Sequence, residues 1–325
     1  MAIKQLGKKG MFLTFIAIAI ISALMIIFAP PNISLSADTQ ALNTKVSNVN
    51  EYVTDLENVY LERTLYAIGT KTIIALIEYM EAQGVFLTDF EDNFEEVLLY
   101  GTIEGVDIDT YYAGEIMTDN TYGDWVDKIT ATAKDAFNID TVYGVSEIIV
   151  YQTTPWVVDV GAKLSFNISS EIASWNKTAI IKTQIEIENF YDPYYLVNTG
   201  GSYENKIRKS GTGPGEWDVE EVKAFIRGDG NYTHWESSPS FLMRFTDDTS
   251  ASSCCGIESL VNPNNVPDKD TSYVDYLYWE SSSPCPNNVL YSVNGMDNEF
   301  KLYSEGISRY GLQDDDYLHC PPPPP

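Results

Sequence analysis

Cysteine and histidine carry the sharpest chemistry in this 325-residue sequence, and both are scarce. The four cysteines all fall in the last 72 residues, at Cys254, Cys255, Cys285 and Cys320. An even number of cysteines in an oxidising compartment predicts up to two disulfides. Because a bridge between adjacent cysteines forces strained geometry, we expect Cys254 and Cys255 to be cross-linked to Cys285 and Cys320 instead.

Metal binding is less favoured than disulfide formation. The sequence has no Cys-x-x-Cys and no His-Glu-x-x-His, and its only histidines are His234 and His319, so a zinc site is not predicted. Calcium is the better alternative, because clustered carboxylates offer oxygen ligands. The clusters are Asp107 and Asp109, Asp247 and Asp248, and Asp314 to Asp316. None fits an EF-hand loop, so we expect solvated surface acids and no bound cofactor.

No catalytic constellation is recognisable. A Ser-His-Asp or Cys-His hydrolase would need His234 or His319 as its base. Gly-x-Ser-x-Gly and P-loop motifs are both missing from the sequence. A pair of carboxylates could hydrolyse glycosides, but 47 acidic residues single out no pair. We therefore expect a protein that is not an enzyme.

Two residue types are candidates for modification or for contacts with a partner. Asn-x-Ser/Thr sequons, the acceptors of N-linked glycans, occur at Asn32, Asn167, Asn176 and Asn231. Tyrosines gather at Tyr111-Tyr112 and in residues 191–195, where loops are expected. Tyrosine rings in loops can stack on sugars or anchor interfaces, but tyrosine also packs well in sheets, and we favour packing for most of them.

Charge separates the first residues from the rest of the chain. The chain has 20 basic and 47 acidic residues, a formal net charge of −27, which argues against nucleic-acid binding and against electrostatic docking on an anionic membrane. No acidic residue precedes Asp38, whereas Lys4, Lys8 and Lys9 come first. Residues 11–29 carry no charge and would span about 28 Å as a helix, which predicts a transmembrane segment. The positive-inside rule then places the N-terminus in the cytoplasm and the acidic remainder outside.

Lys8-Lys9-Gly10, directly before the apolar run, resembles a class III signal, the leader of archaeal type IV pilin-like surface proteins. The resemblance covers about twenty residues. It implies that a prepilin-peptidase-like enzyme cuts after Gly10, so that the mature chain begins at Met11 and keeps its apolar segment. Bacterial-type pilins carry Glu at the fifth mature position, where this chain has Phe15, and this difference weakens the case for a filament subunit. An uncleaved signal anchor and a secretory signal cut near Ser36 are the alternatives.

A long amphipathic helix is predicted over residues 36–83, after the interruption at Pro30-Pro31. Its expected apolar stripe is Leu42, Val46, Val49, Val53, Leu56, Tyr60, Arg63, Ala67, Thr70, Ile74 and Ile77. Such a stripe is typical of a coiled-coil or filament-packing stalk. Apolar residues off the stripe, at Leu65, Ile68 and Ile73, favour a helix that packs on its own head domain.

The fold class predicted for the whole chain is α+β: a transmembrane helix, a long amphipathic helix, and a mostly antiparallel β-sheet head with short helices over residues 84–320. Helices are expected at 89–99, 125–137 and 219–226, strands at 145–151, 156–168, 179–190, 241–245 and 273–279, and a helix or strand at 299–310. The strands before and after residues 171–177 should form a hairpin. Residues 191–216 are rich in turn residues and mark a possible sub-boundary, and residues 321–325 form a polyproline tail.

These features predict a single-pass cell-surface protein with a structural or adhesive role, with a pilin-like filament subunit as one form of that role. The alternative is a membrane-tethered module that binds glycans or peptides, and a tethered hydrolase ranks lower. The expected partners are the lipid bilayer through residues 11–29, a prepilin-peptidase-like enzyme, and further copies of the chain or other pilin-like proteins.

Overall fold

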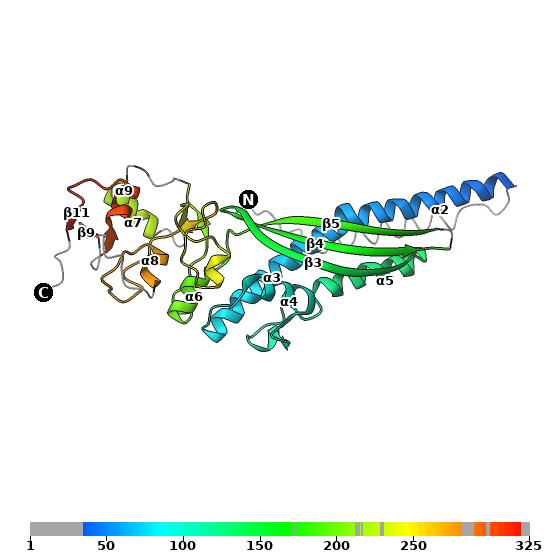
Figure 1. Ribbon diagram of the computed structural model, residues 1–325, viewed down its shortest axis with the longest axis horizontal. Coiled ribbons are helices and arrows are strands. Elements are labelled where there is room, and N and C mark those ends of the chain that lie inside the picture. Colours follow the sequence, from blue (N-terminus) through cyan, green and yellow to red (C-terminus); the bar gives the residue numbers. More distant parts are fainter. Residues whose placement is uncertain are drawn as a thin grey trace, which may run out of the picture. The chain divides into compact units, whose positions relative to one another are not determined.

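The computed structural model describes residues 35–171, 173–211, 215, 217–227, 231–280, 289–296 and 300–319. The leader with Lys8, Lys9, Gly10 and Met11, the apolar segment 11–29 and the tail 321–325 lie outside these residues. Among the helices that are described, none is long and apolar enough to cross a bilayer. Helices and small, mainly antiparallel sheets make up the described chain, which confirms the α+β class at that level (Figure 1).

The chain divides into two compact units. The first contains residues up to 60 together with 127–144 and 164–179, and the second contains residues 61–126, 145–163 and 180 onward. Residues 191–216, where the sequence indicated a sub-boundary, lie inside the second unit.

The predicted long helix is present as three consecutive elements: α2 (Leu35–Asp55), a π-helical turn η1 (Leu56–Tyr60) and α3 (Leu61–Gln83). In the first unit, Val49, Val53 and Leu56 are buried, as the predicted stripe requires. In α3 the buried residues follow a different frame, and they include Leu61, Leu65, Ile68, Thr72, Leu76 and Met80.

The change of frame has a local cause. Leu56 and Leu61 are five residues apart, the repeat of a π-helical turn, whereas the predicted stripe assumed steps of three and four throughout. Arg63 and Ala67, which the stripe placed on the apolar face, are exposed. The off-stripe residues Leu65, Ile68 and Ile73 are fully buried, so α3 packs within its own unit, as those residues indicated.

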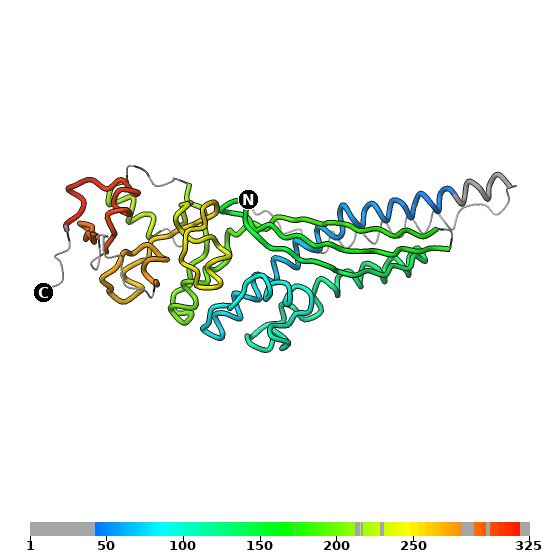
Figure 2. The backbone as a smooth tube through the Cα atoms, viewed as in Figure 1, coloured from blue at the N-terminus to red at the C-terminus, as the bar shows by residue number. Residues whose placement is uncertain are grey.

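Shorter helices begin and end where their capping residues stand. Helix α4 (Phe90–Tyr100) starts at Asp89, whose carboxylate accepts the N–H of Asp92 at 3.0 Å, and ends at Gly101 in the left-handed conformation. Figure 2 shows the chain reversing after α3 and returning as α4. Helix α5 (Tyr122–Phe137) is the other helix expected in this part of the chain.

Three long strands form one sheet in the order β3-β4-β5, with bounds Asp140–Thr154, Val157–Ser169 and Ser174–Glu186 (Figure 1). The N–H of Ser170 bonds to the carbonyl of Ala173 at 2.8 Å, and the N–H of Ile187 bonds to that of Trp156 at 3.1 Å. Both pairs have the same register, and so short a connection permits only an antiparallel pair. The predicted β4–β5 hairpin is confirmed.

Alternation along these strands also follows the sequence. The even-numbered positions of β4 from Val158 to Ile168 are buried. Opposite them, the odd-numbered positions of β5 from Ala179 to Ile185, and Ile187 directly after the strand, are buried too. The other face of the hairpin is therefore the exposed one.

The rest of the second unit is built from short elements. They are β1 (Thr102–Ile103), β2 (Val106–Asp107), η2 (Ile108–Thr110), α6 (Pro193–Thr199), β6 (Arg208–Lys209), α7 (Val219–Arg227), β7 (Asn231–His234), η3 (Met243–Phe245), β8 (Ile257–Glu258), α8 (Asp275–Trp279), β9 (Leu290–Val293), β10 (Lys301–Tyr303), α9 (Ser304–Tyr310) and β11 (Tyr317–His319). They form small sheets with the orders β1-β2, β6-β7-β8 and β10-β9-β11. The pair β6-β7 is parallel, and the pairs β1-β2, β9-β10, β9-β11 and β7-β8 are antiparallel.

Two strand predictions were wrong. Residues 241–245 contain the 3₁₀ turn η3, and residues 273–279 contain helix α8. Both runs are rich in aromatic and large apolar residues and are buried on nearly every side. A short apolar run of this kind has no periodicity that separates a strand from a helix.

The burial of α3 gives a direct test of the helix frame. We expect Ile68→Ala to lower the free energy of unfolding in urea by about 2–5 kcal/mol, because it removes a fully buried side chain and leaves a cavity. The matched control is Ile180→Ala on the exposed face of β5, where 66% of the side chain is accessible and the change should be within about 0.5 kcal/mol. Equal effects for the two variants would contradict the frame described for α3.

Candidate functional site

Arg244 is a fully buried charge, and it lies on η3 with no exposed surface. Its Nη1 donates to Asp192 at 2.6 Å and to Asp275 at 2.9 Å. Its Nη2 donates to the carbonyl of Ile257. The rings of Tyr194 and Tyr232 lie 4.9 and 5.6 Å from the guanidinium carbon. One side chain therefore links α6, β7, β8 and α8.

Asp192 is placed by the start of α6. It is the N-cap of that helix: its Oδ1 accepts the N–H of Tyr194 at 2.9 Å, and Pro193 follows at the first helical position. Its Oδ2 accepts both Arg244 and the hydroxyl of Tyr232, each at 2.6 Å. Asn205 in turn donates to the Tyr232 oxygen at 3.0 Å. The carboxylate therefore performs a capping role and an ion-pairing role at once.

Asp275 is held in a similar way at the start of α8. Its Oδ2 accepts the N–H and the hydroxyl of Ser259 at 3.0 and 2.8 Å in addition to Arg244. Its Oδ1 accepts the N–H of Tyr276 at 2.7 Å. The Ser259 oxygen also lies 2.8 Å from the hydroxyl of Tyr195. Every carboxylate oxygen of this cluster therefore has at least one donor.

A second buried ion pair adjoins the first along β8. Glu258, with no exposed surface, pairs with Nη1 of Arg309 and accepts the hydroxyl of Tyr310 at 2.7 Å. The Arg309 guanidinium lies 4.0 Å from the ring centre of Trp235. Ile257, Glu258 and Ser259 are consecutive, and each contacts one of the two pairs. We call the whole set, Arg244, Asp192, Asp275, Glu258 and Arg309, the buried ion cluster.

Burial shifts the pKa values of this cluster. Burial raises the pKa of Asp192 even though the Arg244 guanidinium lowers it, and burial raises the pKa of Glu258 against the opposing effect of Arg309. Burial opposes the charge of Arg244, but Asp192 and Asp275 outweigh it and raise its pKa. The carboxylates are therefore buried and paired with arginines, an arrangement that organises a fold. The Nε atoms of Arg244 and Arg309 are buried without a hydrogen-bond partner in the described part of the chain.

The disulfide lies just before β8, the strand that contacts both ion pairs. Cys254 and Cys255 are joined to each other, with their Cα atoms 3.7 Å apart, so the expectation that this adjacent pair would not form was wrong. Adjacent Cα atoms are already within bonding reach, and the chain makes a bend there, with Ser253 at a positive φ of 62°. The proposed partners Cys285 and Cys320 lie outside the described residues.

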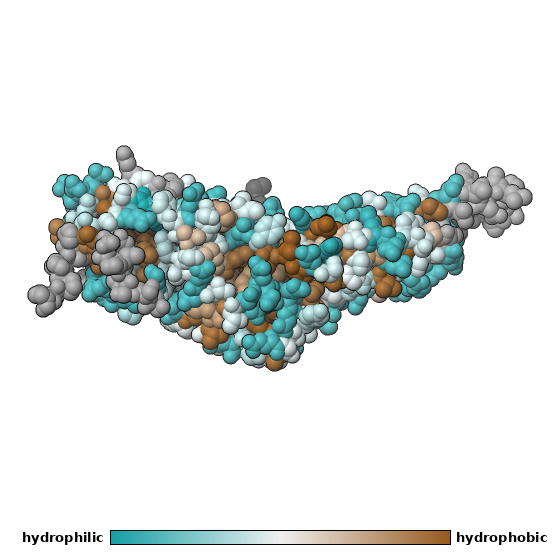
Figure 3. Space-filling view, in the orientation of Figure 1, coloured by the Kyte–Doolittle hydropathy of each residue, from teal (hydrophilic) through white to brown (hydrophobic). Residues whose placement is uncertain are grey.

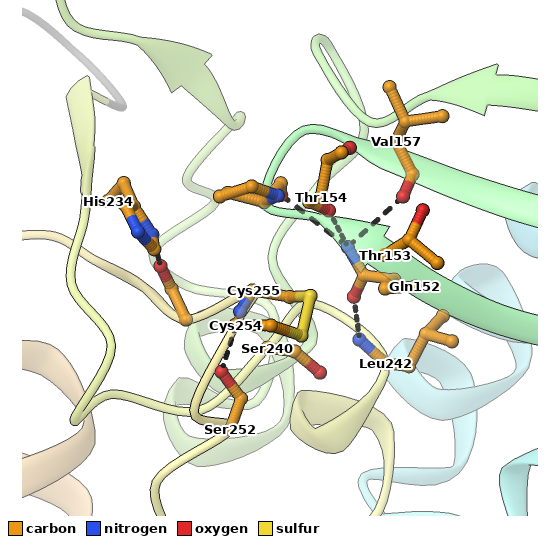
Figure 4. The surroundings of a disulfide bond; sticks show 12 residues. Gln152, Thr153, Thr154, Val157, His234, Ser240, Leu242, Ser252, Cys254 and Cys255 are labelled. Atoms are coloured by element: carbon orange, nitrogen blue, oxygen red, sulfur yellow. Dashed lines mark hydrogen bonds between the residues drawn. A yellow bond between two sulfur atoms is a disulfide. The ribbon is translucent and has the colours of Figure 1, made fainter.

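Hydrogen bonds fix the segment that holds the disulfide (Figure 4). The N–H of Cys255 donates to the hydroxyl of Ser252 at 3.1 Å, and Cys255 is 1% exposed. His234 donates from Nδ1 to the carbonyl of Gly256 at 2.8 Å. Because Cys255 is bonded to Cys254, this histidine has no thiolate to activate at that position. His234 thus anchors β7 to Gly256 through one ring nitrogen, and the residue itself is exposed.

Gln152 joins the end of β3 to η3 near the disulfide (Figure 4). Its Oε1 accepts the N–H of Leu242 at 3.1 Å, and its Nε2 points at the carbonyls of Thr154 and Val157 at 3.3 and 3.4 Å. One side-chain amide thus satisfies the strand turn and orients the segment that carries Arg244.

Several of the acidic residues considered as calcium ligands accept hydrogen bonds from residues close to them in the chain. Asp109 accepts the hydroxyl of Tyr112 at 2.6 Å and the N–H groups of Met117 and Thr118 at 2.9 and 2.7 Å. Burial alone would raise the pKa of Asp109, but these donors lower it. The carboxylate of Asp107 accepts the N–H of Asp109. The carboxylate of Asp248 accepts the N–H of Ser250 in the same way.

The C-terminal acids behave in the same way. Asp314 accepts the hydroxyl of Tyr317 at 2.9 Å, and Asp316 accepts the N–H of Gln313 at 2.9 Å. In the part of the chain that the structure describes, no group of three or more His, Cys, Asp or Glu side chains is placed to hold a metal ion.

The tyrosines of the predicted loops are structural. Tyr194 and Tyr195 are buried, at 1% and 0% exposure, although their segment reads as a loop. Tyr111 packs edge-on against Tyr79 with ring centres 5.0 Å apart, and Tyr112 bonds to Asp109. The preference for packing over ligand binding is therefore supported at these positions.

Open surface is found elsewhere in the second unit. Two clefts of about 560 and 460 Å³ share Tyr66 of α3, whose side chain is 48% exposed. Residues of β3, β4 and β5 complete the larger cleft, with Tyr151, Asp159 and Lys182 among them. Figure 3 shows a face on which hydrophilic residues separate small hydrophobic patches. A surface of this kind permits contacts with a partner.

Three of the four predicted glycan acceptors are described. Asn167 and Asn176 are exposed on β4 and β5, whereas Asn231 at the start of β7 is half-buried and donates to the carbonyl of Phe225 at 3.3 Å. Asn32 lies outside the described residues.

Comparison with known proteins adds no relative. A scan against protein-family models, a search of curated proteins and a search of solved structures each gave no match.

The buried ion cluster was missed at the sequence level, although two signals were present. Asp192-Pro193, followed by Gly200 seven residues later, is a helix start and stop that was interpreted as a loop. Arg244 is a lone charge inside the apolar run 241–245. A charge at such a position needs a buried partner of opposite sign.

Removal of Arg244 tests the cluster. We expect Arg244→Met to lower the free energy of unfolding by about 3–5 kcal/mol at neutral pH, because it leaves Asp192 and Asp275 buried without their cation. Arg227→Met, at the exposed end of α7, is the control and should change it by no more than about 0.5 kcal/mol.

The pH dependence of this variant has a definite sign. A carboxyl with a raised pKa binds its proton more tightly in the folded chain, so its contribution to stability falls as the pH rises above the unfolded value of about 3.9. Loss of Arg244 removes the group that lowers the pKa of Asp192 and makes this fall steeper. The deficit of Arg244→Met should therefore shrink as the pH is lowered toward about 4; a deficit that is independent of pH would contradict the ionic origin.

Thiol labelling tests the disulfide. In the variant Cys285→Ser/Cys320→Ser, denatured without reductant, we expect no alkylation, and after reduction we expect both remaining cysteines to react, because Cys254 and Cys255 are bonded to each other. Intact mass gives the number of labels. Addition of Cys254→Ser is the control, since it should free Cys255 without reduction. Two labels before reduction in the parent variant would refute the adjacent bridge.

Proposed function

We propose that this chain is a membrane-anchored cell-surface protein of structural or adhesive function, not an enzyme, with a pilin-like N-terminal anchor. In this proposal residues 11–29 remain in the bilayer after cleavage at Gly10, and the α+β part stands outside the cell. The filament subunit is the more specific form of the same proposal.

The adjacent disulfide is the observation that supports an external position most directly. Disulfides persist in oxidising compartments and are rare in the cytosol. The bridge lies in the α+β part, which the positive-inside rule assigns to the outside.

The interior of the second unit supports a non-enzymatic role. Asp192 and Glu258, two acids whose pKa values are raised by burial, are paired with arginines and fully buried. Where a catalytic carboxylate would face a cleft, these face the protein core. Helix α3, the second half of the predicted stalk helix, buries its apolar residues in its own unit, as in a helix that supports a sheet head.

A tethered glycan- or peptide-binding module is the second candidate, favoured by the two clefts that share Tyr66. An exposed tyrosine beside the charged side chains of Arg63 and Lys182 could stack on a sugar or anchor an acidic peptide. This candidate keeps the anchor and differs only in what the head does.

The mature N-terminus tests the proposal. Mass spectrometry of membrane and surface material should show a chain that begins at Met11, because the class III-like leader ends at Gly10. Gly10→Val should retain the leader, whereas Gly7→Val, also in the leader, should be cut normally. A chain that begins at Met1 would refute pilin-like processing. A correctly cut chain that never sediments as filaments would favour the tethered module over the subunit.

A further inference from the structure

Asn167 and Asn176 occupy directly opposite positions on the β4–β5 hairpin. The pairs Ser170 with Ala173 and Trp156 with Ile187 fix one register along both strands. Asn167 stands three residues before Ser170, and Asn176 stands three residues after Ala173. In this register Asn167 therefore faces Asn176. Because the Ser170–Ala173 pair is hydrogen-bonded, alternate pairs are too, and Asn167 with Asn176 is a non-hydrogen-bonded pair with Cα atoms about 4.5 Å apart.

The two asparagines lie on the exposed face. Their neighbours along the chain in β4, Phe166 and Ile168, are buried, so Asn167 points the other way. Asn176 is exposed on β5, which is an end strand of the three-stranded sheet. The remaining positions on this face near the turn are small and polar: Ser165, Ser169, Ser174 and Thr178. No large side chain of this hairpin end stands in the way of a bulky group on either amide.

Asn231 provides an internal contrast. It also begins an Asn-x-Thr sequon, but it is half-buried and its amide donates to the carbonyl of Phe225 at 3.3 Å. The sequence pattern alone treats the three described sequons alike, and the structure separates them.

We propose that Asn167 and Asn176 both carry N-linked glycans, so that two sugar chains rise side by side from the exposed face of the β4–β5 hairpin, while Asn231 stays unmodified. The inference rests on the external position in the proposed function. In each attachment the amide nitrogen bonds to the anomeric carbon of a lipid-linked oligosaccharide. The bond from that carbon to the lipid phosphate breaks, the phosphate leaves with the electron pair, and the amide nitrogen loses a proton.

Strand position sets the order of the two attachments. Asn167 lies on the central strand β4, which has a partner on both edges, so a transferase can surround its sequon only before the hairpin and β3 have paired. Asn176 lies on the end strand. We therefore expect the occupancy of Asn176 to equal or exceed that of Asn167.

A single peptide tests the proposal in the full chain, expressed in its own host. Trypsin cuts after Lys163 and Lys177, so residues 164–177 contain both acceptors. Peptide released by trypsin from intact cells should carry the mass of two glycans. Asn167→Gln and Thr178→Ala, which remove one sequon each, should each leave one glycan. Asn231→Gln should change the mass of the protein only by the methylene group that the substitution adds.

The outcomes separate this inference from the proposed function. Recovery of unmodified peptide from intact cells would overturn the glycan pair and leave the external position standing. Release of the peptide only after lysis would contradict the external position, and the mass of the same peptide would still decide whether glycans are attached. A glycan on Asn231 alone would also overturn the inference.

Discussion

The guanidinium of Arg244 ties together stretches of chain that are far apart in sequence. Asp192, Ile257 and Asp275 reach it from α6, β8 and α8, and these elements are short, from two to seven residues. Elements of that length bury too little apolar surface to define their own positions. A buried arginine with several required acceptors allows few alternative arrangements, because each alternative leaves a charge unpaired in the core. The second unit depends on this constraint for its architecture.

The parts of the fold that sequence could predict are those with long, one-sided patterns. The predicted alternation of buried and exposed residues in β4 and β5 was correct because one face is buried for a dozen residues. The prediction of α4 was correct, and Asp89 and Gly101 mark the ends of this helix. The frame of α3 was missed, since one extra residue in the π-helical turn rotates every later position. The runs around Phe241 and Tyr276 were misassigned because the local pattern carries little information where nearly every side is buried.

The buried ion cluster could not be predicted for a different reason. Residues 192, 244 and 275 have no fixed spacing, so their meeting depends on the completed fold. The prediction that Cys254 and Cys255 would not be bonded to each other was wrong. It applied a general rule on disulfide geometry, whereas the local bend at Ser253 is visible only in the structure. The sequons, in contrast, were visible in the sequence, but only the strand register reveals that two of them are neighbours.

Gly256, directly after the two cysteines, has little freedom to vary. A Cβ atom there would lie 2.1 Å from the carbonyl oxygen of Trp235 and 2.3 Å from that of Ser238, both backbone atoms that cannot move aside. The next three residues lead into the buried ion cluster. In evolution, the segment from Cys254 to Ser259 should accumulate amino-acid substitutions more slowly than the surface around it. Distant relatives that keep this fold should retain a glycine after the cysteine pair, together with an acid two residues later, even where little else in their sequences still aligns.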